Sequence, residues 1–209
     1  MMKICFFTED ERIRKADAGV PEVVRLNRPN ADMGDGISLD AFGVLWKDGE
    51  PYGDPYIPEM SALDAYTFPK ISEGFLQERL EPFMNGGSRK LRICVYPMSL
   101  YDRMRALAGA ENLHRHMESA PDFVDALARR VCEHTLSVME IAFQTDFDVF
   151  LLGDTHESEL SPELRTRFLR PYLARLFAMT RAYGKLVGKV GRADENLVEL
   201  GLDAVVEEE

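Results

Sequence analysis

Long apolar runs and cysteines are both scarce in this sequence of 209 residues. No stretch approaches the roughly 18 apolar residues of a membrane-spanning helix, and the start, MMKICFFTED, is too weakly apolar for a signal peptide. The three cysteines, Cys5, Cys94 and Cys132, are widely spaced, and there is no Cys-x-x-Cys pattern for zinc or redox chemistry. We therefore expect buried, reduced thiols and a cytoplasmic location.

Positive charge is also in short supply. The 25 lysines and arginines are outnumbered by 36 aspartates and glutamates, which gives a formal net charge of -11. Nucleic acids and anionic membranes both bind clustered positive charge, so neither is expected as a partner. The sequence also contains no Gly-x-Ser-x-Gly motif, no phosphate-binding glycine loop and no Ser-His-Asp order. If the protein is an enzyme, we expect its substrate to be a small molecule.

From Leu91 onward, short apolar runs alternate with longer amphipathic segments. Strands are predicted at 91–97, 147–152, 185–190 and 202–206. Helices are predicted at 99–107, 111–118, 121–144, 161–184 (interrupted at Pro171) and 194–200. This alternation predicts a parallel sheet with right-handed crossovers, and a single domain over residues 1–209 is the simplest organisation.

The first 90 residues are less regular. Residues 2–8 predict a buried strand, followed by a charged segment that we expect to be helical to about Arg25. Glycine and proline recur from residue 26 to 66, so few long elements are expected there apart from a small hairpin over residues 42–52. This irregular elaboration holds the only tryptophan, so we expect it to pack over another part of the protein. A helix is predicted at 71–84, with Ser72 as its cap.

The segment from Phe147 to Gly184 is the best candidate for a functional site. Its apolar strand stops at Gly153, and three ionisable residues follow at once: Asp154, His156 and Glu157. Ser161 is the expected N-cap of the next helix and Pro162 its first residue. In parallel α/β folds, ligands bind at the loops after the carboxyl ends of strands. The alternative interpretation is a solvated loop whose carboxylates favour the positive end of that helix.

Several stretches from about residue 38 to 206 carry a family resemblance. They are Asp40-Ala-Phe-Gly-Val-Leu-Trp46 with Tyr66-Thr-Phe-Pro69, LYDRMRALAGAENLHRHMESAPDFVDALARRV at 100–131, Gly153-Asp154 with Ser161-Pro162-Glu163-Leu164 and Pro171-Tyr172, Gly184-Lys185, and Glu199-Leu-Gly-Leu-Asp203. In this order they resemble the uroporphyrinogen decarboxylase superfamily, and in particular its methyltransferase-like branch. The resemblance implies a TIM-like (β/α) barrel with its site at the carboxyl ends of the strands.

The predicted strands are too few for a complete barrel, and members of the family are longer than this chain. We therefore predict an incomplete or shortened TIM-like barrel. Such a barrel would leave strand edges and apolar surface open, so we expect a homodimer or a larger partner to cover the opening. A monodisperse monomer with a closed core would contradict this expectation.

The resemblance also implies a chemistry, methyl or one-carbon transfer with a corrinoid partner protein. The family's methyltransferases bind zinc through a His-x-Cys motif, but the corresponding Val187-Gly-Lys-Val-Gly191 has neither residue, so that zinc site is not expected. An alternative set for a divalent metal is Asp154, His156 and Glu157, joined by Asp102 or Asp40. Porphyrinogen decarboxylation is not expected, because the arginine-rich N-terminal motif is not visible and Arg105 stands at the family's tyrosine position, one turn from Tyr101.

Roles follow for the candidate residues. Asp154 would orient or deprotonate the substrate, and His156 would be a general base or metal ligand, with Glu157 beside them. The residues expected to bind substrate are Arg103, Arg105, Tyr101 and Asp40. Arg103 either grips an anion or forms a structural salt bridge to Glu111 or Asp102, and a structural role is favoured for Arg105.

The remaining histidines are expected outside the site. His114 and His116 would lie on the surface, and His134 would be a partly buried residue of the outer helix layer. Two further hypotheses compete with the enzyme. One is a catalytically silent member that binds a ligand or partner, and the other is a fragment of a longer enzyme.

Overall fold

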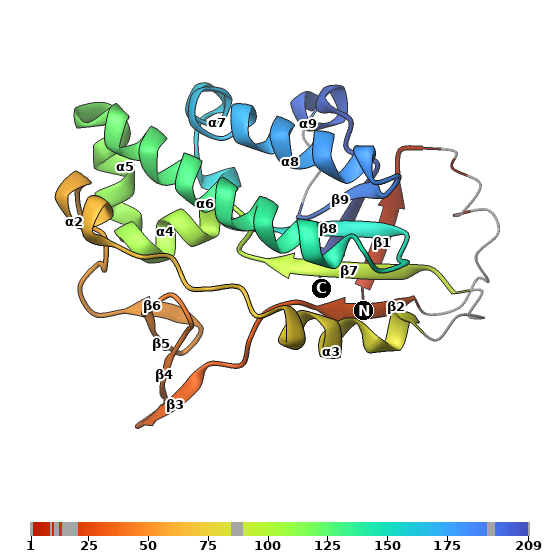
Figure 1. The fold of residues 1–209 in the computed structure, drawn as a ribbon. Coiled ribbons are helices and arrows are strands. Elements are labelled where there is room, and N and C mark those ends of the chain that lie inside the picture. Colours follow the sequence, from red (N-terminus) through yellow and green to blue (C-terminus); the bar gives the residue numbers. More distant parts are fainter. Residues whose placement is uncertain are drawn as a thin grey trace.

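The computed structural model describes residues 2–8, 10, 13, 21–84, 90–191 and 195–208. Its central element is a six-stranded sheet of order β1-β10-β9-β8-β7-β2 (Figure 1). The strands are β1 (Met2–Phe6), β2 (Glu22–Arg25), β7 (Arg92–Pro97), β8 (Val149–Gly153), β9 (Leu186–Val190) and β10 (Ala204–Glu208). Neighbouring strands from β2 through β10 pair in parallel, whereas β1 pairs antiparallel to β10. The predicted parallel sheet is therefore confirmed, with one antiparallel edge strand.

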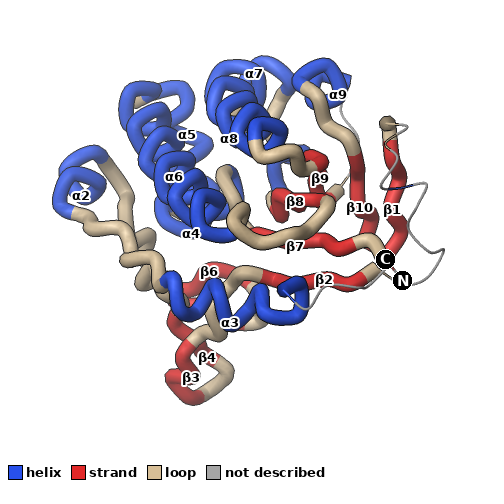
Figure 2. The backbone as a smooth tube through the Cα atoms, turned by 45° about the vertical axis from the view of Figure 1, so that its right-hand side comes forward, coloured by secondary structure: helices blue, strands red, loops and turns tan. Residues whose placement is uncertain are grey.

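Both faces of this sheet are buried, which explains its nearly continuous apolar strands. Because successive side chains point to opposite faces, Cys94 and Tyr96 of β7 join the core under the helices, while Ile93 and Val95 join a second core on the other face. The sheet curls around this second core (Figure 2). The described strands thus form a half-barrel and not a closed TIM barrel.

The inside of the curve is closed within the chain itself. Val149 and Leu151 are each 1% exposed and Ile93 is 0% exposed. Packing is so tight that a Cβ atom added to Gly188 would lie 2.8 Å from Leu151 Cδ1. The open apolar surface that we expected of a short barrel is therefore not present on these residues, whereas β1 and β2 are edge strands of the sheet.

Helices cover the outer face of the sheet and follow the strands closely in sequence (Figure 1). They are α3 (Glu73–Met84), α4 (Tyr101–Ala108), α5 (Ala110–Ser119), α6 (Pro121–Ala142), α7 (Pro162–Phe168), α8 (Arg170–Ala182), α9 (Glu195–Leu200) and a 3-10 helix, η1 (His156–Glu159). Two predicted helix starts are confirmed. Ser161 Oγ accepts the backbone N–H of Leu164 at 3.3 Å, and Ser72 Oγ accepts that of Phe75 at 3.3 Å.

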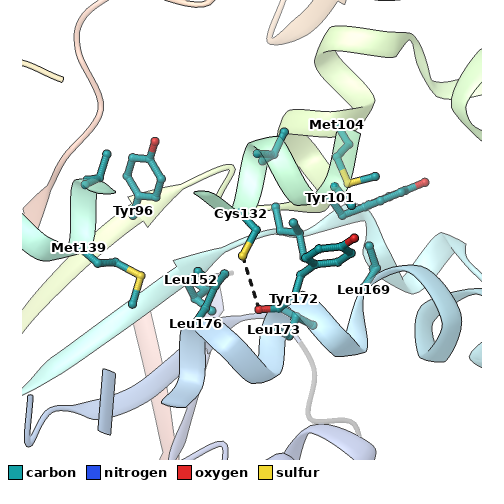
Figure 3. Packing of buried hydrophobic residues seen from close by; sticks show 14 of the residues in the cluster. Tyr96, Tyr101, Met104, Cys132, Met139, Leu152, Leu169, Tyr172, Leu173 and Leu176 are labelled. Carbon is teal, nitrogen blue, oxygen red and sulfur yellow. Dashed lines mark hydrogen bonds between the residues drawn. The ribbon is translucent and has the colours of Figure 1, made fainter. Parts of the chain in front are cut away.

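The core between helices and sheet draws most on α6, and α4, α8 and the strands β7 and β8 supply further residues (Figure 3). Cys132 of α6 donates from its thiol to the carbonyl oxygen of Tyr172 on α8 at 3.8 Å. Burial raises the pKa of Cys132 to about 11, and it also raises the pKa of Cys94. Both thiols are buried and free, as predicted, whereas Cys5 is only partly buried.

The elaboration forms a small antiparallel sheet and one short helix. Its strands are β3 (Ala31–Gly34), β4 (Ile37–Leu39), β5 (Leu45–Lys47) and β6 (Glu50–Tyr52), and its helix is α2 (Met60–Ala65). The predicted hairpin is confirmed as β5–β6, with Asp48 at φ 52° and Gly49 at φ 86° in the turn. As expected, the elaboration packs over the main domain: the Ile57 N–H donates to the Leu107 carbonyl at 2.8 Å.

Two local predictions are wrong. Residues 22–25 form a strand and not the end of a helix, since Val23 and Val24 pair with Ile93 and Cys94 of β7. Most of the predicted helix before them lies outside the described residues. Ser99 does not cap α4, because its hydroxyl donates to Asp154 instead. Within the described part of the chain, no helix has the length and apolar character needed to cross a membrane.

Candidate functional site

A cavity of about 240 Å³ opens where β2 and β7 reach their carboxyl ends. Leu26 and Arg28 line it just after β2, and Pro97 and Met98 line it at the end of β7. Helices α3 and α6 supply further wall residues, and the elaboration contributes Asp40, Phe42 and Trp46. Carboxyl ends of parallel strands are where α/β folds bind ligands, so this cavity is the candidate site.

The backbone holds a strained residue beside this cavity. Met98 has φ 55°, a left-handed conformation that costs a non-glycine residue about 1–3 kcal/mol. The neighbouring Gly153 has no room for a side chain, because an added Cβ would lie 2.8 Å from the Pro97 Cα atom. The ends of β7 and β8 are thus pressed together where the loops that carry the polar residues begin.

Asp40 and Arg103 form a preorganised ion pair in the cavity wall. Arg103 Nη1 lies 2.5 Å from Asp40 Oδ2, and the guanidinium lies over the Phe42 ring at 3.7 Å from its centroid. Asp40 Oδ1 accepts the backbone N–H groups of Phe42 and Val44, each at 2.9 Å. The structural partner of Arg103 is therefore Asp40, and the alternatives Glu111 and Asp102 are wrong.

Two buried donors of the cavity lining have no hydrogen-bond partner among the described residues. They are Nε of Arg103 and Nε1 of Trp46. Arg103 is only 9% exposed, so water reaches its guanidinium poorly. A buried donor left unpaired costs about 1–3 kcal/mol, which a ligand acceptor that reached it after a small side-chain shift would recover.

His134 is a partly buried residue of α6 in the outer helix layer, as predicted, and it also lies in the cavity wall. Its Nε2 lies 3.2 Å from the Pro69 carbonyl oxygen, which can only accept, so Nε2 carries the proton. Nδ1 then accepts the hydroxyl of Tyr96 at 3.4 Å. Val138, four residues further along the same helix face, also lines the cavity, so this face of α6 forms part of the wall.

Acid should destabilise the protein through His134. Burial lowers the pKa of His134 to about 4, whereas the unfolded chain takes up that proton near pH 6.5. Above pH 6.5, His134 is therefore neutral in both the folded and the unfolded chain and does not lower the free energy of unfolding. As the pH drops towards 4, the free energy of unfolding falls by about 2 kcal/mol, a figure that allows for the partial exposure of the ring.

Urea unfolding between pH 7 and pH 4 measures this effect. In His134→Gln the fall should be smaller by about that amount, because glutamine keeps a donor for the Pro69 carbonyl but does not titrate. Contributions from other groups are common to both proteins and cancel in the difference. Parallel stability curves for the two proteins would contradict the assignment.

Asp154 acts as a buried tie between two loops. It is 0% exposed, and its carboxylate accepts Ser99 Oγ at 2.5 Å, Leu100 N at 2.9 Å and Asp102 N at 3.0 Å. Burial, and next the carboxylate of Asp102, raises the pKa of Asp154 to about 6. Its oxygens are thus engaged by the chain itself, where they fix the loop after β8 against the start of α4.

Asp102 in turn orients His156. Asp102 Oδ2 accepts the Thr155 N–H at 2.8 Å, and Oδ1 lies 3.1 Å from both the backbone nitrogen and Nδ1 of His156. The His156 side chain is 34% exposed, whereas that of Asp102 is 7% exposed. A carboxylate on Nδ1 leaves the opposite nitrogen, Nε2, able to accept a proton, which is the arrangement of an oriented general base.

Glu157 pairs with Lys189 of β9 at 2.9 Å instead of joining the carboxylate and imidazole groups of these residues. Consequently, the predicted metal set of Asp154, His156 and Glu157 with Asp102 or Asp40 is not assembled. Nowhere in the described ranges do three or more His, Cys, Asp or Glu side chains come together as a metal site. The zinc implied by the family resemblance therefore does not fit the residues present here.

Two other predicted residues lie outside the cavity lining. Arg105 lies 3.2 Å from Glu50 of β6 and 3.9 Å from Glu159 of η1, which agrees with the structural role favoured for it. Tyr101 is 3% exposed, and burial raises its pKa to about 12. Of the four residues predicted to bind substrate, Arg103 and Asp40 line the cavity, whereas Arg105 and Tyr101 do not.

Comparison with known proteins defines the class of fold. No protein-family model matches the chain, and no curated protein matches it either. Among solved structures, a methyltransferase from Methanosarcina mazei matches with a TM-score of 0.55 at 12% identity, over 73% of this chain and 47% of that one. The chain thus spans about half the length of that neighbour. At this identity the likeness shows the fold alone, a methyltransferase-like α/β half-barrel.

Proposed function

We propose that the protein binds a small-molecule substrate in the cavity at β2 and β7 and takes part in methyl transfer with a corrinoid partner, as a uroporphyrinogen decarboxylase-like protein. The observation that carries the proposal is the pair of unpartnered buried donors, Arg103 Nε and Trp46 Nε1, in a cavity at the carboxyl ends of parallel strands. The methyltransferase of similar fold supports the type of reaction.

The residues divide into binding and positioning roles. Arg103 donates to the substrate, and Asp40 holds the guanidinium in place. A thiol or hydroxyl that accepts a methyl group loses its proton, and His156 Nε2 takes that proton while Asp102 orients the ring. His156 does not line the cavity, so the substrate must extend from Arg103 past the start of α4 to the imidazole, which Asp102, the residue before Arg103, holds. Asp154 and Glu157 act by positioning the loop after β8.

His156→Gln tests this role. Methylcobalamin supplied with a panel of small thiols and phenols should lose its methyl group at a rate that depends on the protein, followed by its visible absorbance. His156→Gln should lower that rate about 100-fold with an unchanged unfolding midpoint, since general-base catalysis contributes at least this much. His114→Gln, at an exposed histidine, is the matched control and should keep the rate. An undiminished rate in His156→Gln, or no protein-dependent demethylation, would reject the proposal.

A catalytically silent ligand-binding protein is the second candidate. It is favoured by the engagement of Asp154 with three donors and by the absence of an assembled metal set in the described ranges. Saturable ligand binding without demethylation would select it. The homodimer stays a prediction, and solution scattering at several concentrations measures it.

A further inference from the structure

The cavity is positive in a strongly acidic protein. Four charged side chains line it: Arg28, Lys70, Arg103 and Asp40. Asp40 neutralises Arg103, so Arg28 and Lys70 remain, and neither has an ion-pair partner in the part of the chain that the structure describes. Both are exposed and hence lie at the mouth of the cavity. An excess of two positive charges in a chain of net charge -11 favours an anionic ligand.

The walls between these charges are apolar and largely aromatic. Phe42, Trp46, Phe75 and Tyr96 all contribute rings. The guanidinium of Arg28 lies 5.5 Å from the centroid of the Phe75 ring, so this cation sits directly against the apolar wall. A cavity of about 150 Å³ holds one benzene molecule. The 240 Å³ available here therefore suits one substituted aromatic ring.

Among the residues that the structure describes, the buried groups of the cavity lining that lack a hydrogen-bond partner are all donors. They are Arg103 Nε and Trp46 Nε1. The buried acceptors Asp40 and His134 are already engaged, because Asp40 receives Arg103 and two backbone N–H groups, and His134 Nδ1 receives the Tyr96 hydroxyl. A ligand that presents acceptors gains partners at these buried donors, whereas an ammonium group is repelled by Arg28 and Lys70.

We propose that the cavity selects a small aromatic carboxylate. Arg28 and Lys70 receive the carboxylate at the mouth, the aromatic walls hold the ring, and Arg103 Nε and Trp46 Nε1 donate to a second, uncharged acceptor on the ring. This assignment rests on the proposed function, which makes the cavity the substrate site, and adds the chemical class of the substrate.

Fluorine NMR titration with 4-fluorobenzoate, and with 4-fluorobenzamide as a neutral molecule of the same shape, tests the charge selection. We expect the benzoate to bind about tenfold more tightly than the amide. Arg28→Gln/Lys70→Gln should abolish this preference. Lys47→Gln/Arg129→Gln removes two exposed charges outside the cavity and should keep it. Quenching of Trp46, the only tryptophan, reports occupancy independently.

The results separate this assignment from the proposed function. Equal affinity for both probes, a preference that survives in Arg28→Gln/Lys70→Gln, or no benzoate binding at millimolar concentration would overturn the carboxylate selection. If both probes bind equally and both weaken in Trp46→Phe, the carboxylate selection fails but the cavity remains the binding site. If Trp46→Phe leaves the binding of both unchanged, the binding site is elsewhere, and the proposed function fails with the assignment.

Discussion

Asp154→Ala is expected to lower the free energy of unfolding by about 3–5 kcal/mol, the range for removing one partner from a buried charged network. The reason is that Ser99 Oγ and the N–H groups of Leu100 and Asp102 all donate to this fully buried carboxylate. Without it the donors are buried and unpaired. Urea unfolding followed by circular dichroism measures the loss.

Two companion variants make this result interpretable. Asp154→Asn keeps the shape but turns one acceptor into a donor that faces other donors, so we expect a loss of about 2 kcal/mol. Asp146→Ala removes an aspartate whose side chain is 80% exposed and should change stability by about 0.5 kcal/mol or less. Full stability with lost activity in Asp154→Ala would instead support the chemical role first predicted for this residue.

Lys189→Met is expected to destabilise the protein by a similar amount, about 3–4 kcal/mol. The Lys189 side chain is 2% exposed, and its Nζ lies 2.9 Å from Glu157 Oε1 and 2.9 Å from the Asp154 carbonyl oxygen. Replacing it leaves the buried Glu157 carboxylate, 8% exposed, without its counter-charge. Thermal and urea unfolding of the purified variant measure the change.

A double-mutant cycle isolates the ion pair from the rest of the lysine's contacts. Lys189→Met/Glu157→Leu should recover about 2 kcal/mol relative to Lys189→Met, because no buried charge is left unpaired. Arg170→Met is the matched control, since Arg170 is 3.8 Å from an exposed Glu199 and should matter little. Strict additivity of the two single variants would show that the pair is not coupled.

The elements could be predicted where the local pattern is long. Helix α6 has an apolar stripe over 22 residues, and Ser161-Pro162 marks the start of α7 by its own chemistry. By contrast, β2 has only four residues, too few to show a period, and it becomes a strand because β7 offers it a partner. Short segments take their structure from their neighbours in space.

For the candidate site, too, local patterns in the sequence determined some features and the tertiary structure determined the others. The sequence alone determined that ionisable residues follow β8, that glycine and proline keep the elements of residues 26–66 short, and that the second half alternates strand and helix. Only the tertiary structure decided which of those residues pair: Asp154 with a loop over 50 residues earlier, Asp40 with Arg103, Glu157 with Lys189. Periodicity and capping act between near neighbours in the chain, whereas hydrogen bonds and ion pairs depend on ångström-scale distances that only the assembled sheet and its loops define.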